Sequence, residues 1–305
     1  MAQSKVAIIG AGRVGSTIAY ALLLRNIAAQ IMLVDINKDL CQGEVEDLSD
    51  VLSFSTTSSI SHATLEEAAQ ADIIIIAAGR AQESTQDRLA LVRANGAIAK
   101  SIIASLKNIN PQVIIIVVAN PVDIITRLVQ ESGILPRNQI FGSGTMLDTQ
   151  RLRGYISRKI AVAEQSVHVY ILGEHGDSQF VAWSDADIGG MPIEQFPGLN
   201  QDILDDMAKQ ARQKAYEIIA CKGSTYYGVA TCVWAYCESI LFNQRRIMPV
   251  SWWVESLNCT LSMPCVIGRN GVEQIVDIPL TAKEQQQLQS SVQILSKIYD
   301  ELSGS

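Results

Sequence analysis

The chain has 305 residues, 48% of them hydrophobic and 18% charged, and it carries a formal net charge of −7 at pH 7. This composition excludes a disordered chain. It is typical of a globular protein long enough for two packed domains or one large α/β unit. The acidic balance argues against a nucleic-acid partner, which would select for a basic surface.

The apolar runs and the cysteines restrict where the protein works. The longest runs, residues 73–78 and 113–119, are far too short to span a bilayer and are typical of strands buried on both faces of a parallel sheet. Strand-like sequence begins near Lys5 with no secretory apolar region before it, and the six cysteines lack metal-ligand spacing. We therefore expect a cytoplasmic protein with reduced thiols, no membrane partner and no bound metal.

A glycine-rich turn opens the chain. The apolar residues 5–9 lead into Gly10, Gly12 and Gly15, and an alanine- and leucine-rich stretch at helical spacing follows. In a strand–turn–helix unit of this kind, the first glycine permits the tight turn. The second lets backbone amides approach a pyrophosphate, and the third lets the helix pack against the strand. The pattern predicts a dinucleotide site at the N-terminus of the helix.

The next strand indicates which dinucleotide binds. Residues 30–34 end in Asp35, about twenty residues beyond the last glycine, as the fingerprint requires. A carboxylate there accepts hydrogen bonds from a ribose diol and repels a 2′-phosphate. The sequence therefore predicts NAD rather than NADP, the alternative being an ordinary turn aspartate.

The rest of the first half alternates helices and strands. Further strands are expected at residues 58–61, 72–78, 113–118 and 139–142, with helices at residues 37–53, 65–70, 89–109 and 122–131. This order predicts a doubly wound parallel sheet of Rossmann type, which binds ligands beyond the carboxyl ends of its strands. Gly79 and Asn120 follow two of those strands. Residues 79–88 between them are either a lid or a plain surface connector.

The second half changes to antiparallel style. Strands are expected at residues 166–172, 179–184, 248–254 and 262–267, and helices at residues 145–157, 202–220, 225–240 and 281–302. Asn270 and Gly271 predict a type I′ hairpin turn. We therefore expect α/β architecture with an NAD-binding domain at residues 1–142 and an α+β substrate domain at residues 143–305.

Three side chains suggest acid–base chemistry. His175 stands between Gly173 and Gly176 at the end of a strand-like run, where it can pass a proton or merely satisfy a local hydrogen bond. Asp148 and Arg151 are three residues apart on an expected helix and share one face. A surface ion pair is the alternative interpretation of that spacing.

These motifs together resemble the L-lactate dehydrogenase branch of the lactate/malate dehydrogenase family over essentially the whole chain. The matching segments keep the family's order and spacing: residues 10–15, 120–123, 142–148 with Arg151, 173–178, 222–225 and 266–271. The resemblance implies an NAD-dependent oxidoreductase of glycolysis and fermentation that reversibly reduces pyruvate to L-lactate with NADH.

The resemblance also assigns roles. His175 corresponds to the proton donor, and Asp148 to the carboxylate that orients its ring and favours its charged form. Arg151 corresponds to the residue that grips the substrate carboxylate with a planar fork. Arg88 corresponds to a lid arginine that, with Asn120, stabilises charge on the carbonyl oxygen. Thr225 corresponds to a residue that borders the small substrate group, and the cofactor contacts correspond to Gly10, Gly12, Arg13, Val14, Gly15, Asp35, Gly79, Val118, Asn120 and Ser143.

Gln82 stands where the malate branch has an arginine for a second substrate carboxylate. Glutamine there favours pyruvate over oxaloacetate. A broader 2-hydroxy acid dehydrogenase, a malate dehydrogenase and a non-catalytic dinucleotide-binding protein stay open as alternatives. Ser84 and Thr85 replace the Pro-Gly pair that is usual in the lid, so the lid's hinge is expected to differ.

Arg153 and His168 match the two basic positions that bind fructose bisphosphate between subunits of bacterial L-lactate dehydrogenases. The resemblance therefore implies activation by that effector and a homotetramer, although both residues also suit an ordinary polar surface.

Overall fold

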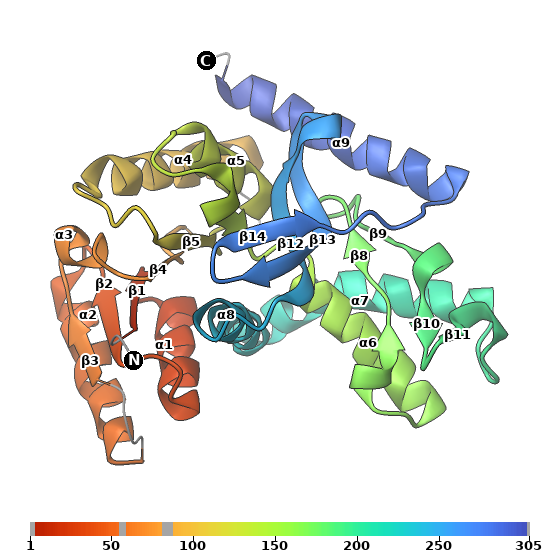
Figure 1. The fold of residues 1–305 in the computed structure, drawn as a ribbon, viewed down its shortest axis with the longest axis horizontal. Coiled ribbons are helices and arrows are strands. Elements are labelled where there is room, and N and C mark those ends of the chain that lie inside the picture. Colours follow the sequence, from red (N-terminus) through yellow and green to blue (C-terminus); the bar gives the residue numbers. More distant parts are fainter. Residues whose placement is uncertain (1–3, 55–58, 81–87, 304–305) are drawn as a thin grey trace.

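The computed structural model describes residues 4–54, 59–80 and 88–303 of the chain. A nine-stranded sheet of order β14-β13-β12-β6-β5-β4-β1-β2-β3 runs through these residues. In Figure 1 the strands β1, β2 and β3 lie with their helices at the left of the view, and α6, α7 and the short strands β8 to β11 lie at the right. The strands of this sheet are β1 (Lys5–Ile9), β2 (Gln30–Val34), β3 (Ser59–His62), β4 (Ile73–Ile76), β5 (Ile114–Val117), β6 (Ile140–Gly142), β12 (Arg246–Val254), β13 (Cys259–Gly268) and β14 (Gly271–Ile275).

The first six strands are parallel and are covered by helices on both faces, so the predicted doubly wound sheet is confirmed. Because side chains alternate along a strand, Ile8 of β1 joins a core with α1 and α8, whereas Ile9 joins a second core with α4 and α5. The helices of the chain are α1 (Arg13–Arg25), α2 (Lys38–Ser49), α3 (Leu65–Ala68), α4 (Arg88–Ser105), α5 (Val122–Glu131), α6 (Met146–Ile160), α7 (Gln201–Lys222), α8 (Tyr227–Leu241) and α9 (Ala282–Ser303). None of them, within the described ranges, is long and apolar enough to cross a membrane.

The change from parallel to antiparallel pairing falls at Gly142. There β12 joins β6 through the pair Ser251 and Gly142. A Cβ on Gly142 would stand 2.3 Å from Thr126 Oγ1 and 3.0 Å from the Cβ of Ser251, so only glycine fits between α5 and β12. The boundary between residues 1–142 and 143–305 stays a prediction, because one continuous sheet carries both parts.

The antiparallel strands after α6 are shorter than expected. Residues 166–172 form two two-residue strands, β7 (Val167–His168) and β8 (Ile171–Leu172), and residues 179–184 yield only β9 (Phe180–Val181) before a 3₁₀ turn. Side chains of α6 take the place of a ladder here, since Thr149 Oγ1 accepts the amide of Ile171 and Thr145 Oγ1 donates to its carbonyl. Two small sheets result, β8-β9 and β11-β10-β7, the latter completed by β10 (Asp187–Ile188) and β11 (Met191–Pro192).

The hairpin between β13 and β14 forms where it was expected, but its turn is not type I′. Gly268 pairs with Gly271, and the positive φ falls on Gly271 at 84° rather than on Asn270. A Cβ on Gly271 would lie 2.2 Å from the carbonyl oxygen of Asn138, and Asn138 Nδ2 donates to the carbonyl of Asn270. Contact with the segment before β6 therefore sets the turn, which local propensity cannot reveal.

Candidate active site

His175, Asp148 and Arg151 meet beside the start of α6. His175 Nδ1 lies 2.8 Å from Asp148 Oδ2, and Arg151 Nη1 donates to Asp148 Oδ1 at 3.2 Å. A carboxylate only accepts, so Nδ1 carries the hydrogen and Nε2 is left for another partner. The side chains of Asp148 and Arg151 are 4% and 7% exposed, and that of His175 is 29% exposed. Burial excludes the surface ion pair and leaves a histidine that small molecules can reach.

The start of α6 fixes Asp148. Just before the helix, the backbone amide of Thr145 donates to Ser262 Oγ at 3.1 Å, and its hydroxyl donates to the carbonyl of Ile171. These bonds tie the helix start to β13 and to the strand that carries His175. Asp148 lies in the first helical turn, where the positive end of the helix dipole favours a carboxylate.

The loop of His175 is shaped by its two flanking glycines. Gly173 has a φ of +85°, and a Cβ on it would stand 2.5 Å from Ser291 Oγ of α9. A Cβ on Gly176 would meet the buried Glu174 carboxylate at 2.7 Å. Glu174 in turn accepts the hydroxyl of Ser178 at 2.6 Å. The loop therefore closes on itself and leans on α9, which holds the imidazole in place.

Charge around His175 favours its protonated form. Burial alone would lower the pKa of His175, and the charge of Arg151 adds to that effect. The charge and hydrogen bond of Asp148, together with the charge of Asp123, outweigh both and raise the pKa above its ordinary value. A histidine of this kind can donate a proton at neutral pH and take it back.

Asp123 is a buried acid in this site whose role the sequence did not indicate. Its Oδ2 accepts the backbone amide of His175 at 2.7 Å, and its Oδ1 accepts the hydroxyl of Ser251 at 2.5 Å. Burial raises the pKa of Asp123 to about 6, although both hydrogen bonds and the charge of His175 act to lower it. The available signal was one acidic residue inside the otherwise apolar start of α5.

The glycine turn fits a dinucleotide pyrophosphate. Gly10 has a φ of +108°, and a Cβ on Gly15 would overlap the carbonyl oxygen of Gly10 at 1.8 Å. No described atom lies within 4 Å of the point where a Cβ would stand on Gly12. Within the described residues, the start of α1 also lacks a side-chain cap and an acidic first turn. Its open N–H groups beside Gly12 make a ready anion site, which Arg13 and Val14 border.

Asp35 stands at the end of β2, as expected, and has a second task. Its Oδ2 accepts the amide of Ala11 at 2.7 Å and its Oδ1 accepts the amide of Asn37 at 2.8 Å. The carboxylate therefore pins the glycine turn to β2. Each of its oxygens retains acceptor capacity for a ribose hydroxyl.

The carboxyl edge of the sheet gathers the remaining predicted contacts. Gly79 follows β4, Val118 and Asn120 follow β5, and Ser143 follows β6. The buried Asn95 of α4, which the sequence did not single out, joins two of these segments. It accepts the amide of Arg80 at 2.7 Å and donates to the carbonyl of Asn120 at 2.7 Å. Ser143 is held by Tyr236, whose hydroxyl donates to its carbonyl at 2.9 Å.

Thr225 lies between α7 and α8, next to the cofactor turn. Its neighbour Ser224 accepts a hydrogen bond from Arg13 Nη1 at 3.2 Å, which joins residues 211 positions apart. This bond brings the segment of Thr225, which the resemblance assigns to the substrate, close to the glycine turn. The structure does not test Gln82, which lies outside the described residues, nor the side chain of Arg88, whose backbone begins α4.

Arg153 of α6 contacts the backbone of the segment that carries His168. Arg153 Nε and Nη2 both donate to the carbonyl of Val169, at 3.2 and 3.1 Å, and His168 is exposed on β7. Burial lowers the pKa of Arg153, although Tyr170 acts against this. The guanidinium therefore stands beside the backbone of the residue that follows His168.

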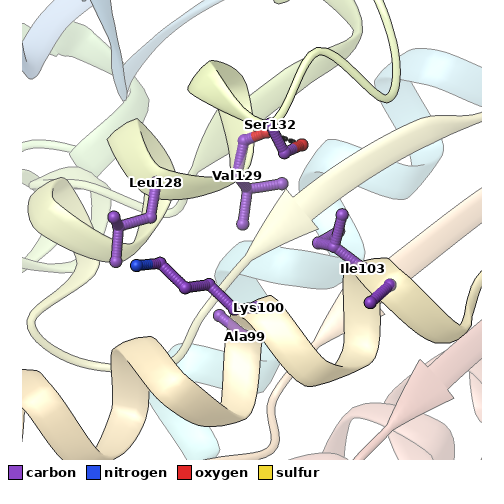
Figure 2. A pocket seen from close by; sticks show the side chains of 7 residues that line it. Ala99, Lys100, Ile103, Leu128, Val129 and Ser132 are labelled. Carbon is purple, nitrogen blue, oxygen red and sulfur yellow. Dashed lines mark hydrogen bonds between the residues drawn. The ribbon is translucent and has the colours of Figure 1, made fainter.

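An open, mainly apolar hollow lies elsewhere. It occupies about 240 Å³ between α4 and α5, and Figure 2 shows Ile103, Leu128 and Val129 around it with Lys100 reaching across. None of its lining residues belongs to the predicted site. The described residues contain no cluster of three or more His, Cys, Asp or Glu side chains that could hold a metal ion.

Comparison with known proteins agrees with this geometry. The NAD-binding domain of lactate/malate dehydrogenases matches residues 4–142, and the alpha/beta C-terminal domain of the same proteins matches residues 145–303. L-lactate dehydrogenase A of Rhizopus oryzae is 45% identical over 97% of this chain and 92% of its own length. The L-lactate dehydrogenase of Lacticaseibacillus casei is 40% identical over 97% of this chain and 93% of its own.

Solved structures of lactate dehydrogenases are also similar to this chain. A lactate dehydrogenase from a Medee basin deep-sea metagenome library superposes with a TM-score of 0.95 and 34% identity, over 99% of this chain and 100% of that one. The minor L-lactate dehydrogenase of Enterococcus mundtii gives a TM-score of 0.94 and 36% identity, over 98% of each chain. The predicted fold class and NAD cofactor are thereby confirmed, and the chain belongs to the lactate/malate dehydrogenase family.

Proposed function

We propose that this NAD-dependent oxidoreductase is an L-lactate dehydrogenase that interconverts pyruvate and L-lactate. The observation that carries the proposal is the buried carboxylate of Asp148, which bonds His175 on one oxygen and Arg151 on the other. His175 can exchange a proton with a substrate, and Arg151 can hold an anionic group of the same substrate. The relatives named as L-lactate dehydrogenases support the same reaction, a step of glycolysis and fermentation.

Each residue then has a chemical task. Bound NADH supplies a hydride to the keto carbon. Protonated His175 donates from Nε2 to the carbonyl oxygen, because its Nδ1 is held by Asp148. Arg151 has further N–H groups beyond the one on Asp148, and these grip the substrate carboxylate. Arg88 and Asn120 stabilise the negative charge that grows on the carbonyl oxygen.

Substrate choice rests on Gln82 and Thr225. A neutral glutamine leaves a second substrate carboxylate uncompensated in a closed site, so oxaloacetate is disfavoured. Thr225, half-buried between α7 and α8, borders the methyl group of pyruvate. A broader 2-hydroxy acid dehydrogenase is the second candidate, since the size of the side-chain pocket depends partly on the segment that contains Gln82.

The test is NADH oxidation with 2-keto acids of increasing side-chain length, in the wild type and in His175→Asn. We expect rapid turnover of pyruvate, a steep fall with chain length, and loss of turnover with retained NADH binding in His175→Asn. Equal kcat/KM along the series would favour the broader enzyme. NADH binding without turnover of any keto acid by the wild type would favour a non-catalytic protein.

We also propose that the protein is a cytoplasmic homotetramer that fructose bisphosphate activates. The contact of Arg153 with the carbonyl of Val169, the residue after His168, supports the effector site, because it brings the guanidinium to the segment that carries His168. We expect the effector to lower the half-saturating pyruvate concentration of the wild type. Arg153→Gln should remove this response and keep turnover at saturating pyruvate, and an equal response in both proteins would disprove the site.

A further inference from the structure

Asp123 is almost fully buried, at 2% exposure, and the proposed reaction assigns it no step. It lies in the first turn of α5, three residues after Asn120. One carboxylate oxygen accepts the backbone amide of His175 at 2.7 Å, and the other accepts the hydroxyl of Ser251 at 2.5 Å. A single side chain thus joins the edge that carries Asn120, the histidine loop and the central strand β12.

The charge of this group needs an explanation. Holding one amide and one hydroxyl is a task that a neutral asparagine can perform, whereas burying a carboxylate carries a large desolvation cost. The start of α5 and the two donors offset only part of that cost, as the raised pKa of Asp123 shows. This carboxylate accepts the backbone amide of His175, the proposed proton donor. A charge that is buried there at such a cost points to an effect on the protonation of His175.

We propose that Asp123 is a positioning residue for His175, which fixes the backbone of the histidine loop and adds a second negative charge to that of Asp148. This inference rests on the proposed function of His175 as the proton donor. Asp123 acts through the loop and its electric field, since its hydrogen bond reaches the backbone amide of His175 rather than the ring.

The charges around His175 determine in which direction its pKa moves when the charge of Asp123 is removed. Asp148 and Asp123 raise the pKa of His175, and Arg151 and burial lower it. Asp123 itself faces His175 and Glu174. Removing the charge of Asp123 therefore lowers the pKa of His175. Pyruvate reduction, which needs the protonated ring, then fails at lower pH, and lactate oxidation, which needs the neutral ring, begins at lower pH.

The direct test is an NMR titration of protein labelled at histidine Cε1, comparing the wild type with Asp123→Asn. The chain has three histidines, so the exposed His62 and His168 serve as internal references. Thr126→Val is the matched control. Thr126 is buried one turn later on α5, and its hydroxyl has no partner among the described residues. We expect a lower titration midpoint for His175 in Asp123→Asn alone.

The pH profiles give a second readout that a merely structural role would not move. In Asp123→Asn we expect kcat/KM for pyruvate to fall about threefold or more on the alkaline side and to match the wild type on the acid side. Lactate oxidation should rise at intermediate pH. Equal losses in both directions at every pH would mean that Asp123 holds the loop without acting on the charge of His175, and would overturn the proposed electrostatic effect.

Ser251→Ala keeps the test decisive if Asp123→Asn does not fold. Loss of the Ser251 hydrogen bond raises the pKa of Asp123, so more of the carboxyl is neutral and the midpoint of His175 should again fall. An unchanged midpoint in both variants would overturn the proposal. The titration needs no turnover, so a wild type that reduces no keto acid would count against the proposed function and leave this result readable.

Discussion

The carboxylate of Asp148 lies between an imidazole and a guanidinium, with one oxygen for each. Because both the acid and Arg151 are buried, neither charge is well solvated by water, and each depends on the other. The arrangement orients the ring of His175 and at the same time presents the fork of Arg151. One acid thus sets both the proton donor and the anion grip.

Arg151→Lys tests the anion grip. Lysine keeps the positive charge near Asp148 but cannot offer two parallel N–H groups to a carboxylate. We expect kcat/KM for pyruvate to fall by about 10- to 100-fold, mostly through a higher KM. Steady-state kinetics with a thermal-unfolding check on the variant decide this, and an unchanged KM would show that the substrate carboxylate binds elsewhere.

The raised pKa of His175 predicts opposite pH dependences for the two directions. Pyruvate reduction should lose kcat/KM as pH rises through that pKa, and lactate oxidation should gain it. Asp148→Asn removes the attraction that raises the pKa, so both transitions should move to lower pH. Profiles of kcat/KM against pH for pyruvate reduction and for lactate oxidation check this. Transitions that stay where they are in Asp148→Asn would refute the electrostatic role of Asp148.

Among the secondary-structure elements, those with continuous apolar runs could be predicted and those fixed by distant contacts could not. The apolar run from Ile73 to Ile76 predicts a strand buried on both faces, and the glycine turn predicts the start of α1. The break between β7 and β8 depends on Thr145 and Thr149 of α6. Such side-chain bonds to a distant backbone leave no local pattern.

The residues of the candidate site also divide into those that the sequence indicated and those that it did not. His175, Asp148 and Arg151 stand in motifs with recognisable spacing, so the sequence indicated them. Asp123 and Ser251 are 128 positions apart, and nothing in either segment shows that they meet. The lid residues Gln82 and Arg88 stay predictions, because Gln82 and the side chain of Arg88 lie outside the described part of the chain.

Gly142→Ala tests the junction between β6 and β12. A methyl group there would overlap Thr126 Oγ1 and Val122 Cγ2 and crowd Ser251. Overpacking of this kind costs about 1–3 kcal/mol of unfolding free energy or more. We expect a lower urea midpoint. Gly43→Ala on α2 is the control, since no described atom lies within 4 Å of its added Cβ and alanine favours the helix. An equal change of the urea midpoint in Gly142→Ala and Gly43→Ala would refute the tight junction.

For the protein as a whole, one sheet connects the dinucleotide half to the substrate half. Ser251 of β12 lies opposite Gly142 and bonds Asp123, so the last strands of the chain support the site from behind. Some large apolar side chains of the helices stay exposed, among them Tyr20 and Leu24 of α1 and Ile219 of α7. Surfaces of this kind are typical of subunit contacts.

These exposed apolar side chains support the proposed homotetramer. Light scattering after gel filtration should give a mass near four times that of the 33.2 kDa chain. Leu24→Glu places a charge among the exposed apolar side chains and should shift the mass towards dimers or monomers. A monomeric wild type at micromolar concentration would refute the assembly, and an unshifted tetramer in Leu24→Glu would exclude α1 from the interface.

Preference between pyruvate and oxaloacetate tests the proposed reaction most directly. With NADH, the wild type should show a much higher kcat/KM for pyruvate than for oxaloacetate, and Gln82→Arg should move the ratio towards oxaloacetate by about tenfold or more, because the new cation pairs the second carboxylate. A wild type that prefers oxaloacetate, or a ratio that Gln82→Arg leaves unchanged, would show that this chain is not the L-lactate dehydrogenase proposed here or that Gln82 does not read the substrate.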